Sequence, residues 1–221
     1  MVIGAISRAL EPEISELTKL LHINASPRGD KSQSAQLANA HIQQRRGSNA
    51  RIQVDVLNLW TETLPEFDGD KNAAKLSFFG VGEMTAAGQG AWDQIAAITR
   101  RFIEADEYVF NIPMWNGGVP YKLKHYIDVI TQPGLLFGFD PERGYFGLLE
   151  NKTAHVFYTS GVFSPGADTK YGADFHSTYM DWWFGLVGID AVVTDRHQPS
   201  ILTADPTGDF EKVFERVKAA A

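Results

Sequence analysis

The sequence predicts an α/β domain in which helices cover both faces of a parallel five-stranded sheet, a doubly wound fold. Three observations lead to this prediction. Patterns typical of strands and of helices alternate along the chain, as expected for strands joined by helical crossovers. Several strand-like runs are apolar on both faces, as buried parallel strands are. The length of 221 residues, 44% of them hydrophobic, suits one domain with a sizeable core.

The first strand and the first helix follow an N-terminal segment of different character. Residues 1–18 carry several charges and no strand or helix period, and we interpret them as an extension that precedes the domain at residues 19–221. The apolar run Leu20–Ile23 predicts a buried strand. It ends in a cluster of turn residues, Asn24–Asp30. The helical pattern that follows covers Ser34–Arg46.

The rest of the chain continues the alternation, apart from residues 61–90, whose pattern is the least legible. The helical segments carry an apolar stripe, and the strand segments are short apolar or alternating runs. The expected strands are Val54–Leu59, Tyr108–Ile112, Ala154–Tyr158 and Ala191–Thr194, and the expected helices are Ala91–Glu104, Val119–Ile130, Asp174–Leu186 and Phe210–Ala220. Five strands in a chain of this length fit the flavodoxin-like order 2-1-3-4-5.

Composition and charge exclude several classes of function. The net charge of −7, from 27 acidic residues against 20 Lys and Arg, argues against a nucleic-acid partner. The absence of cysteine excludes disulfides, iron–sulfur clusters, thiolate zinc sites and cysteine nucleophiles. No apolar run approaches the ~18 residues of a membrane-spanning helix, and the N-terminus lacks the basic start of a signal peptide. We therefore expect a soluble cytoplasmic protein without a membrane partner.

The loop after the first strand is the first candidate binding site. Ligands of such sheets bind beyond the carboxyl ends of the strands, at the switch point between strands 1 and 3. The segment Ser26–Ser34 places serine hydroxyls and Arg28 at the start of a helix, where an anion such as phosphate is favoured. Alternatively, Ser32 or Ser34 could simply cap the helix. Neither GxxxxGK[ST] nor GxGxxG occurs, so a P-loop or dinucleotide fingerprint is not the explanation.

Two further loops are expected at the same edge of the sheet. The segment Pro113–Pro120 combines an apolar wall with Trp115, Asn116 and two glycines, and glycines allow a flat ligand to approach the backbone. A tight turn with Trp115 packed in the core is the alternative. The segment Thr159–Phe163 adds small residues after the fourth strand. Three converging loops indicate a ligand site more strongly than any one of them.

Together these residues resemble a known family. The patterns Ser26-x5-Ser32-Gln33-Ser34, Pro113-Met114-Trp115-Asn116 and Thr159-Ser160-Gly161 are similar to those of the FMN-dependent NADH-azoreductases, also called FMN-dependent NADH:quinone oxidoreductases. The resemblance runs from about Thr18 to the C-terminus. It implies a flavodoxin-like fold, bound FMN with NADH or NADPH as electron donor, and a quinone or azo compound as acceptor. It also implies a homodimer with active sites at the dimer interface.

The resemblance implies residue roles as well. The residues expected at the FMN phosphate are Ser26, Ser32, Gln33 and Ser34, and the charge of Arg28 in the same loop adds it to the expected cofactor-binding residues. The residues expected around the isoalloxazine are Pro113, Met114, Trp115, Asn116, Gly117, Thr159, Ser160 and Gly161. The substrate pocket is expected to involve Trp115, Val162, Phe163 and, from the dimer partner, Phe139. Many members have Tyr at Trp115, an aromatic at Gly117 and Ser-Arg-Gly-Gly at Thr159–Val162. These departures affect the expected substrate more than the expected cofactor.

The sequence fits several other functions less well. The six histidines show no HExxH spacing, so no metal site is expected. Asp174 and His176 could suggest a hydrolase with Ser160, but GxSxG is absent. The alternative to an enzyme is a flavodoxin-type electron carrier or a non-catalytic FMN-binding protein. Because a flavin carries the chemistry, no catalytic acid–base pair is expected. The aromatics of the last third and of Leu135–Phe146 exceed what one small core absorbs, which favours an interface.

Overall fold

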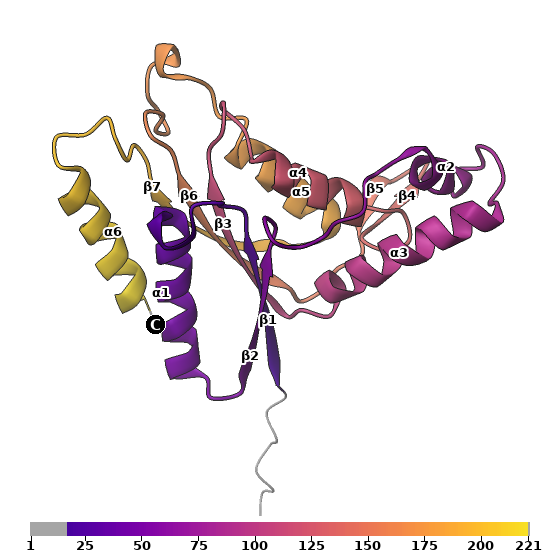
Figure 1. Cartoon of the computed structure of the whole chain (residues 1–221), viewed down its shortest axis with the longest axis horizontal. Helices are drawn as coiled ribbons and strands as arrows, with labels where there is room; N and C mark the ends of the chain where they lie inside the picture. The colour runs from indigo at the N-terminus through magenta and orange to yellow at the C-terminus, as the bar shows by residue number, and fades with distance from the viewer. Residues whose placement is uncertain (1–16, 221) are drawn as a thin grey trace, which may run out of the picture.

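The computed structural model describes residues 17–220, in which a parallel sheet lies between two layers of helices (Figure 1). The sheet has the order β2-β1-β3-β6-β7, and all four neighbouring pairs are parallel. Its strands are β1 Thr18–Asn24, β2 Ile52–Asn58, β3 Glu107–Pro113, β6 Thr153–Thr159 and β7 Ala191–His197. Counted among the sheet strands alone, this is the order 2-1-3-4-5, so the predicted fold class is confirmed.

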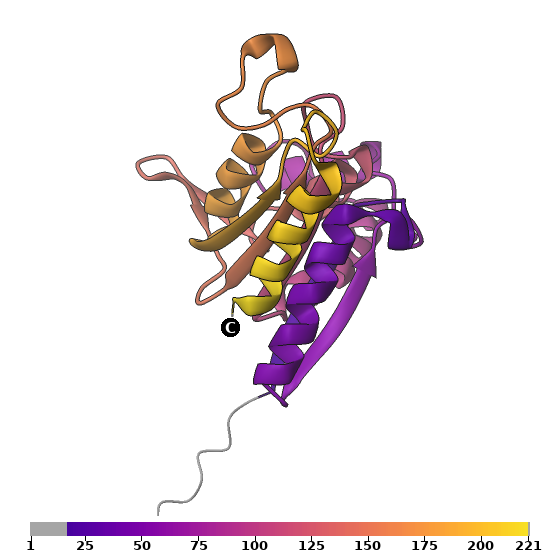
Figure 2. The same ribbon diagram turned by 90° about the vertical axis from the view of Figure 1, so that its left-hand side faces the viewer.

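Two helices cover one face of the sheet and three cover the other. On the first face lie α1 (Gln33–Ser48) and α6 (Pro206–Ala219), which run side by side in Figure 2. On the second face lie α3 (Ala86–Ile103), α4 (Tyr121–Ile130) and α5 (Ser177–Val187). Alternation along each strand divides the core between the faces, because successive side chains point to opposite sides. In β1, Leu20 packs toward α1 and Leu21 packs toward the other layer.

The poorly patterned segment 61–90 contains a short helix and the start of a longer one. The helix α2 spans Gly69–Ser77, and α3 begins at Ala86 rather than at Ala91. Side-chain caps fix both starts, since the Asp68 carboxylate accepts a hydrogen bond from the Lys71 N–H at 3.1 Å. The Thr85 hydroxyl accepts one from the Gly88 N–H at 3.0 Å. The other predicted elements differ from the structure only at their ends.

An antiparallel hairpin between α4 and β6 was not expected as secondary structure. It pairs β4 (Phe137–Asp140) with β5 (Gly144–Gly147), and the Asp140 carboxylate closes its turn by accepting the N–H groups of Glu142 and Arg143 at 2.9 Å. The hairpin packs against the end of α5. A Cβ on Gly147 would lie 2.2 Å from the Gly188 nitrogen, so this contact requires glycine.

The first strand begins at Thr18, the last residue of the predicted extension. Residues 1–16 lie outside the described residues, so the extension stays a prediction. Two short 3-10 helices complete the fold, η1 (Gly29–Lys31) before α1 and η2 (Thr169–Tyr171) before α5. Within residues 17–220, no helix has both the length and the apolar character needed to cross a membrane.

Candidate functional site

The loop after β1 forms a buried serine cluster at the N-terminus of α1. Ser26 and Ser32 are each 3% exposed and Ser34 is fully buried. The Ser32 hydroxyl accepts a hydrogen bond from the Ala35 N–H at 3.3 Å and lies 3.2 Å from the Ser34 hydroxyl. The capping role that the sequence left open is therefore present. It does not use up the anion-binding capacity of the helix, because the first backbone N–H groups have no intrahelical acceptor.

The other two predicted residues of this loop lie at its outer side. Arg28 is exposed at the start of η1, and its backbone N–H donates to the Ser26 hydroxyl at 3.4 Å. Gln33 is half-buried and is the first residue of α1. Arg28 can thus contribute positive charge beside the helix N-terminus, whereas Gln33 supplies a backbone N–H of the first turn.

A buried polar network lies beneath the serine cluster and was not anticipated from the sequence. The His22 Nε2 lies 2.8 Å from the Asn111 side-chain oxygen, and the Asn111 amide donates to the Asn24 side-chain oxygen at 2.9 Å. The same Asn111 amide reaches the Ser34 hydroxyl at 3.5 Å, and the Ser26 N–H donates to Asn24 at 3.0 Å. Burial lowers the pKa of His22, which favours a neutral ring that donates from Nε2. This network fixes the serine loop to β1 and β3.

The loop after β3 is a tight turn that presents its backbone at the same edge of the sheet. Trp115 and Gly118 exchange two backbone hydrogen bonds of 2.9 Å. The central residues Asn116 and Gly117 both have positive φ, 50° and 83°, a conformation for which Asn-Gly is the preferred pair. The Met114 N–H donates to the Thr159 carbonyl at 2.7 Å, which ties this turn to the loop after β6.

Trp115 belongs to an aromatic cluster above the sheet edge rather than to the core. Its ring centroid lies 5.5 Å from that of Trp60 and 6.2 Å from that of Tyr121. The Trp60 indole N–H donates to the Ala25 carbonyl at 3.0 Å, so the loops after β1, β2 and β3 are joined. Sequence reasoning missed Trp60, although its position directly after the second strand was a usable signal.

The loop after β6 places small residues beside these elements. Thr159 and Ser160 are 7% and 5% exposed, and the Ser160 hydroxyl donates to the Phe163 carbonyl. The Gly161 carbonyl accepts the Ile201 N–H at 2.8 Å, which brings the segment after β7 to this loop. Of the two residues of this loop that were expected in the substrate pocket, Val162 is exposed and Phe163 is buried.

The contacts of Ser160, Asp174 and His176 argue against a serine hydrolase. The Asp174 carboxylate lies before α5 and accepts the N–H groups of Ser177 at 2.7 Å and His176 at 3.1 Å. Burial lowers the pKa of His176 to about 4, and its ring stacks edge-on against Tyr158. Ser160 is bonded to a carbonyl, so no Ser–His–Asp relay forms. Among the residues that the structure describes, no group of three His, Asp or Glu side chains could hold a metal ion.

An open pocket of about 710 Å³ lies between the turn after β3 and α5. Its walls include Trp115, Asn116, Tyr121, Phe175, Tyr179 and Trp182. Of the predicted site residues, only Trp115 and Asn116 line it; the serine loop and Thr159–Phe163 lie outside its walls. Phe139 lies on β4, half exposed, with its ring centroid 5.1 Å from that of Tyr145, and it does not line this pocket.

Comparison with known proteins places these loops in context. A family model described as flavodoxin-like fold matches residues 18–218. A protein of Ruegeria pomeroyi named FMN-dependent NADH:quinone oxidoreductase is 55% identical over 204 residues, which cover 92% of this chain and 100% of the relative. A protein of Desulfotalea psychrophila with the same name is 41% identical over 93% of this chain and 95% of the relative.

A solved structure is similar over nearly the whole chain. It is an FMN-dependent NADH-azoreductase from Bacillus anthracis in complex with FMN, with a TM-score of 0.78 and 25% sequence identity. The match covers 92% of this chain and 97% of that protein. The family model, which spans residues 18–218, includes all of the loops described above.

Proposed function

Because the chain belongs to the family of FMN-dependent NADH:quinone oxidoreductases, we propose that it is an FMN-dependent NAD(P)H oxidoreductase that reduces quinones, azo compounds or both. The observation that carries this proposal is the position of the serine cluster. It combines a helix N-terminus with Ser26, Ser32 and Ser34 at the switch point of the sheet, and Trp60 joins the start of this loop to Trp115 in the turn after β3.

The serine loop fits a single phosphate group. The first turn of α1 offers backbone N–H donors and the positive end of the helix dipole. Arg28 and Lys31 add positive charge around Asp30. The Ser32 and Ser34 hydroxyls contact each other and the Asn111 amide reaches Ser34, so contacts within the protein position both hydroxyls. We assign Ser26, Ser32, Gln33 and Ser34 to the phosphate, with Arg28 at its rim.

The adjoining loops fit a planar ring system. The turn at Asn116 and Gly117, both with positive φ, presents its backbone at this edge of the sheet. Pro113, Met114 and Trp115 would lie along one edge of the isoalloxazine and Thr159, Ser160 and Gly161 along the other. The hydrogen bond from Met114 to Thr159 holds these two edges at a fixed separation. A buried ring of this kind is held by shape and by backbone donors rather than by charge.

Bound FMN would supply the capacity to accept a hydride and to pass on two electrons. The residues of this chain would bind and orient it, and the aromatic cluster of Trp60, Trp115 and Tyr121 would keep water from one side. The reaction consumes one hydride from NADH or NADPH and one proton from solvent, and a quinone leaves as the hydroquinone. No acid–base pair is required by this scheme.

The test begins with the absorbance spectrum of the purified protein and identification of the flavin after release. NADH oxidation is then measured with and without a benzoquinone. We expect released FMN and oxidation that depends on the quinone. Bound FMN with negligible direct oxidation would instead identify an electron carrier, and a protein that binds no flavin would overturn the proposal.

We also propose that the protein is a homodimer in which Phe139 reaches the site of the partner subunit. Phe139 and Tyr145 on the hairpin are 50% and 62% exposed, and Phe175 and Trp182 beside the open pocket are 69% and 59% exposed. Exposed apolar surface of this kind marks an interface. Light scattering at micromolar concentration is expected to give twice the chain mass. A fully active monomer would contradict this arrangement.

A further inference from the structure

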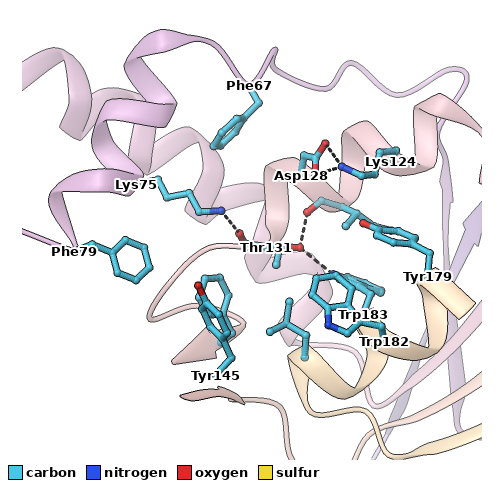
Figure 3. A pocket seen from close by; sticks show the side chains of 13 residues that line it. Phe67, Lys75, Phe79, Lys124, Asp128, Thr131, Tyr145, Tyr179, Trp182 and Trp183 are labelled. Carbon is cyan, nitrogen blue, oxygen red and sulfur yellow. Dashed lines mark hydrogen bonds and ion pairs between the residues drawn. The ribbon is translucent and has the colours of Figure 1, made fainter. Parts of the chain in front are cut away.

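Two groups of apolar side chains adjoin the candidate site. The first surrounds a second pocket, of about 450 Å³, between α2, α4, the β4–β5 hairpin and α5 (Figure 3). Tyr145 and Trp182 form part of its wall, and both belong to the surface that the proposed dimer would bury, so we assign this pocket to the subunit interface. The second group lies in the loops that follow β6 and β7, and consists of Val162, Ile201 and Leu202.

The segment that follows β7 is held against the loop after β6 by three backbone hydrogen bonds. The N–H groups of Ile201 and Leu202 donate to the Gly161 carbonyl at 2.8 and 3.1 Å. The Ser200 N–H donates to the Ser160 carbonyl at 2.8 Å. These bonds fix the backbone of the segment beside the loop that is assigned to one edge of the isoalloxazine.

The side chain of Ile201 lies over the backbone of Gly161 and is nevertheless open to solvent. A Cβ on Gly161 would be 3.0 Å from the Ile201 Cδ1 and 3.6 Å from its Cγ1. Ile201 is 71% exposed, more than any other large apolar side chain of residues 17–220, and Leu202 and Val162 are 52% and 45% exposed. Single apolar side chains are common on a protein surface, whereas neighbouring ones on an anchored backbone indicate a binding surface.

The two segments that carry these side chains are uncharged. Residues 159–167 and 198–204 include no Asp, Glu, Lys or Arg. The Ser160 hydroxyl donates to the Phe163 carbonyl, and the Gly161 carbonyl already accepts two N–H groups. A ligand group on this surface would therefore be stabilised mainly by burial of apolar area. Such a surface favours an alkyl group and disfavours an anionic group such as a sulfonate.

We propose that Ile201 and Leu202 are specificity-determining residues that select quinones with an alkyl substituent. This inference rests on the proposed function. The quinone ring would take its place at the edge formed by Gly161, and the alkyl group would lie on Val162, Ile201 and Leu202. The alkyl group keeps all of its bonds during reduction to the hydroquinone, so these side chains affect the choice of acceptor and not the chemistry.

The experiment measures the affinity of two quinones for the FMN-loaded protein by isothermal titration calorimetry without NADH. The probes are methyl-1,4-benzoquinone and pentyl-1,4-benzoquinone, and the chain has no cysteine thiol that could add to either ring. We expect the pentyl compound to bind about tenfold more tightly, as burial of about two of its four additional methylenes provides. The double variant Ile201→Ser, Leu202→Ser should lose this preference.

Two further double variants keep the result specific to this surface. The exchange Ile201→Leu, Leu202→Ile retains the apolar area and should retain the preference. The variant Val56→Ser, Val193→Ser removes side chains that are 53% and 57% exposed on the two edge strands, and it should also retain the preference. Equal affinities of the two quinones for the unmodified protein would overturn the proposal, as would a preference that survives Ile201→Ser, Leu202→Ser.

The oligomeric state and the flavin reaction are measured on the same samples. Light scattering should give the same mass for the Ile201→Ser, Leu202→Ser variant as for the unmodified protein. A loss of subunit association in this variant would place both side chains in the interface and contradict the proposal. Bound FMN and reduction of methyl-1,4-benzoquinone, together with equal affinities, would refute this inference alone. A protein without FMN or without quinone reduction would refute the proposed function, and this inference with it.

Discussion

Asn111 on β3 donates a hydrogen bond from its side-chain amide to the side-chain oxygen of Asn24, its direct neighbour at the end of β1, across 2.9 Å. The two residues are paired in the sheet register at the point where the strand order reverses. Asn111 also meets His22 and Ser34, and Asn24 accepts the Ser26 N–H. The amide of Asn111 thus connects the core of the sheet to the loop assigned to the phosphate.

Replacement of Asn111 by Leu is expected to destabilise the protein and to weaken FMN binding. The variant leaves His22 and Asn24 without their shared partner in the buried interior, which costs about 1–3 kcal/mol. It also frees Ser34, so the phosphate loop loses part of its fixed geometry. Urea denaturation and flavin titration check the two effects. Asn72→Leu, on the exposed side of α2, is the control and should change neither quantity appreciably. Unaltered FMN affinity in Asn111→Leu would show that the network is structural only.

The double variant Ser32→Ala, Ser34→Ala is expected to bind FMN at least about tenfold to a hundredfold more weakly, because the loss of even one hydrogen bond to a charged phosphate costs about 1.5–3 kcal/mol. The variant also removes the α1 cap, so stability and affinity must be separated. Thr85→Ala is the matched control, since Thr85 caps α3 far from the phosphate loop in the same way. That control should lose stability and keep its FMN affinity. Full FMN affinity in the double variant would remove these serines from the site.

The sequence predicted those parts of the site that depend on the residue types of neighbouring positions in the chain. The serine loop was found because turn residues end an apolar run, and the loop after β3 because an aromatic, an amide and two glycines follow a strand there. Trp60 was missed because its partners, Trp115 in the loop after β3 and Tyr121 at the start of α4, are distant in sequence and contact it only in the folded protein. The hairpin at Phe137–Gly147 was missed because its strands are short and glycine-rich, and its contact with α5 is set by tertiary packing.

Stability is expected to fall as the pH is lowered from 7 toward 4. Burial lowers the pKa of His176 and of His41 to about 4, whereas both groups titrate near 6.5 in the unfolded chain. Between pH 6.5 and pH 4 the unfolded state binds more protons than the folded state does. The stability that is present above pH 6.5 is therefore lost as the pH falls toward 4. For fully buried His176 the difference corresponds to about 3 kcal/mol.

This effect is measured by urea denaturation at a series of pH values. His176→Leu cannot titrate and should therefore reduce the dependence of stability on pH in that range. His125→Gln is the comparison variant, because the ring of His125 is only half-buried and bonds the Pro65 carbonyl. A His176→Leu protein with the pH dependence of the unmodified chain would show that His176 does not carry the effect.

Turnover is expected to follow a ping-pong scheme. The phosphate, fixed at Ser26–Ser34, would leave one accessible face of the ring system beside Trp115 and Asn116, which line the open pocket. NADH or NADPH must stack on this face with its donor carbon about 3–3.5 Å from the acceptor nitrogen. A quinone or azo compound needs the same face to receive two electrons. Two planar molecules cannot occupy one face together, so the oxidised nicotinamide has to leave before the acceptor binds.

Initial rates measured while both substrates are varied should therefore give parallel double-reciprocal lines. The aromatic wall offers a second check, because Trp115→Leu removes stacking surface that both substrates would use. We expect this variant to raise KM for NADH and for the quinone together, whereas Trp92→Leu, on α3 and outside both pockets, should leave both values unchanged. Intersecting lines would reveal a complex that holds both substrates at once, and a Trp115→Leu effect on only one substrate would place the other elsewhere. Either result would mean that the pocket has two separate stacking places, contrary to the single shared face from which the scheme is derived.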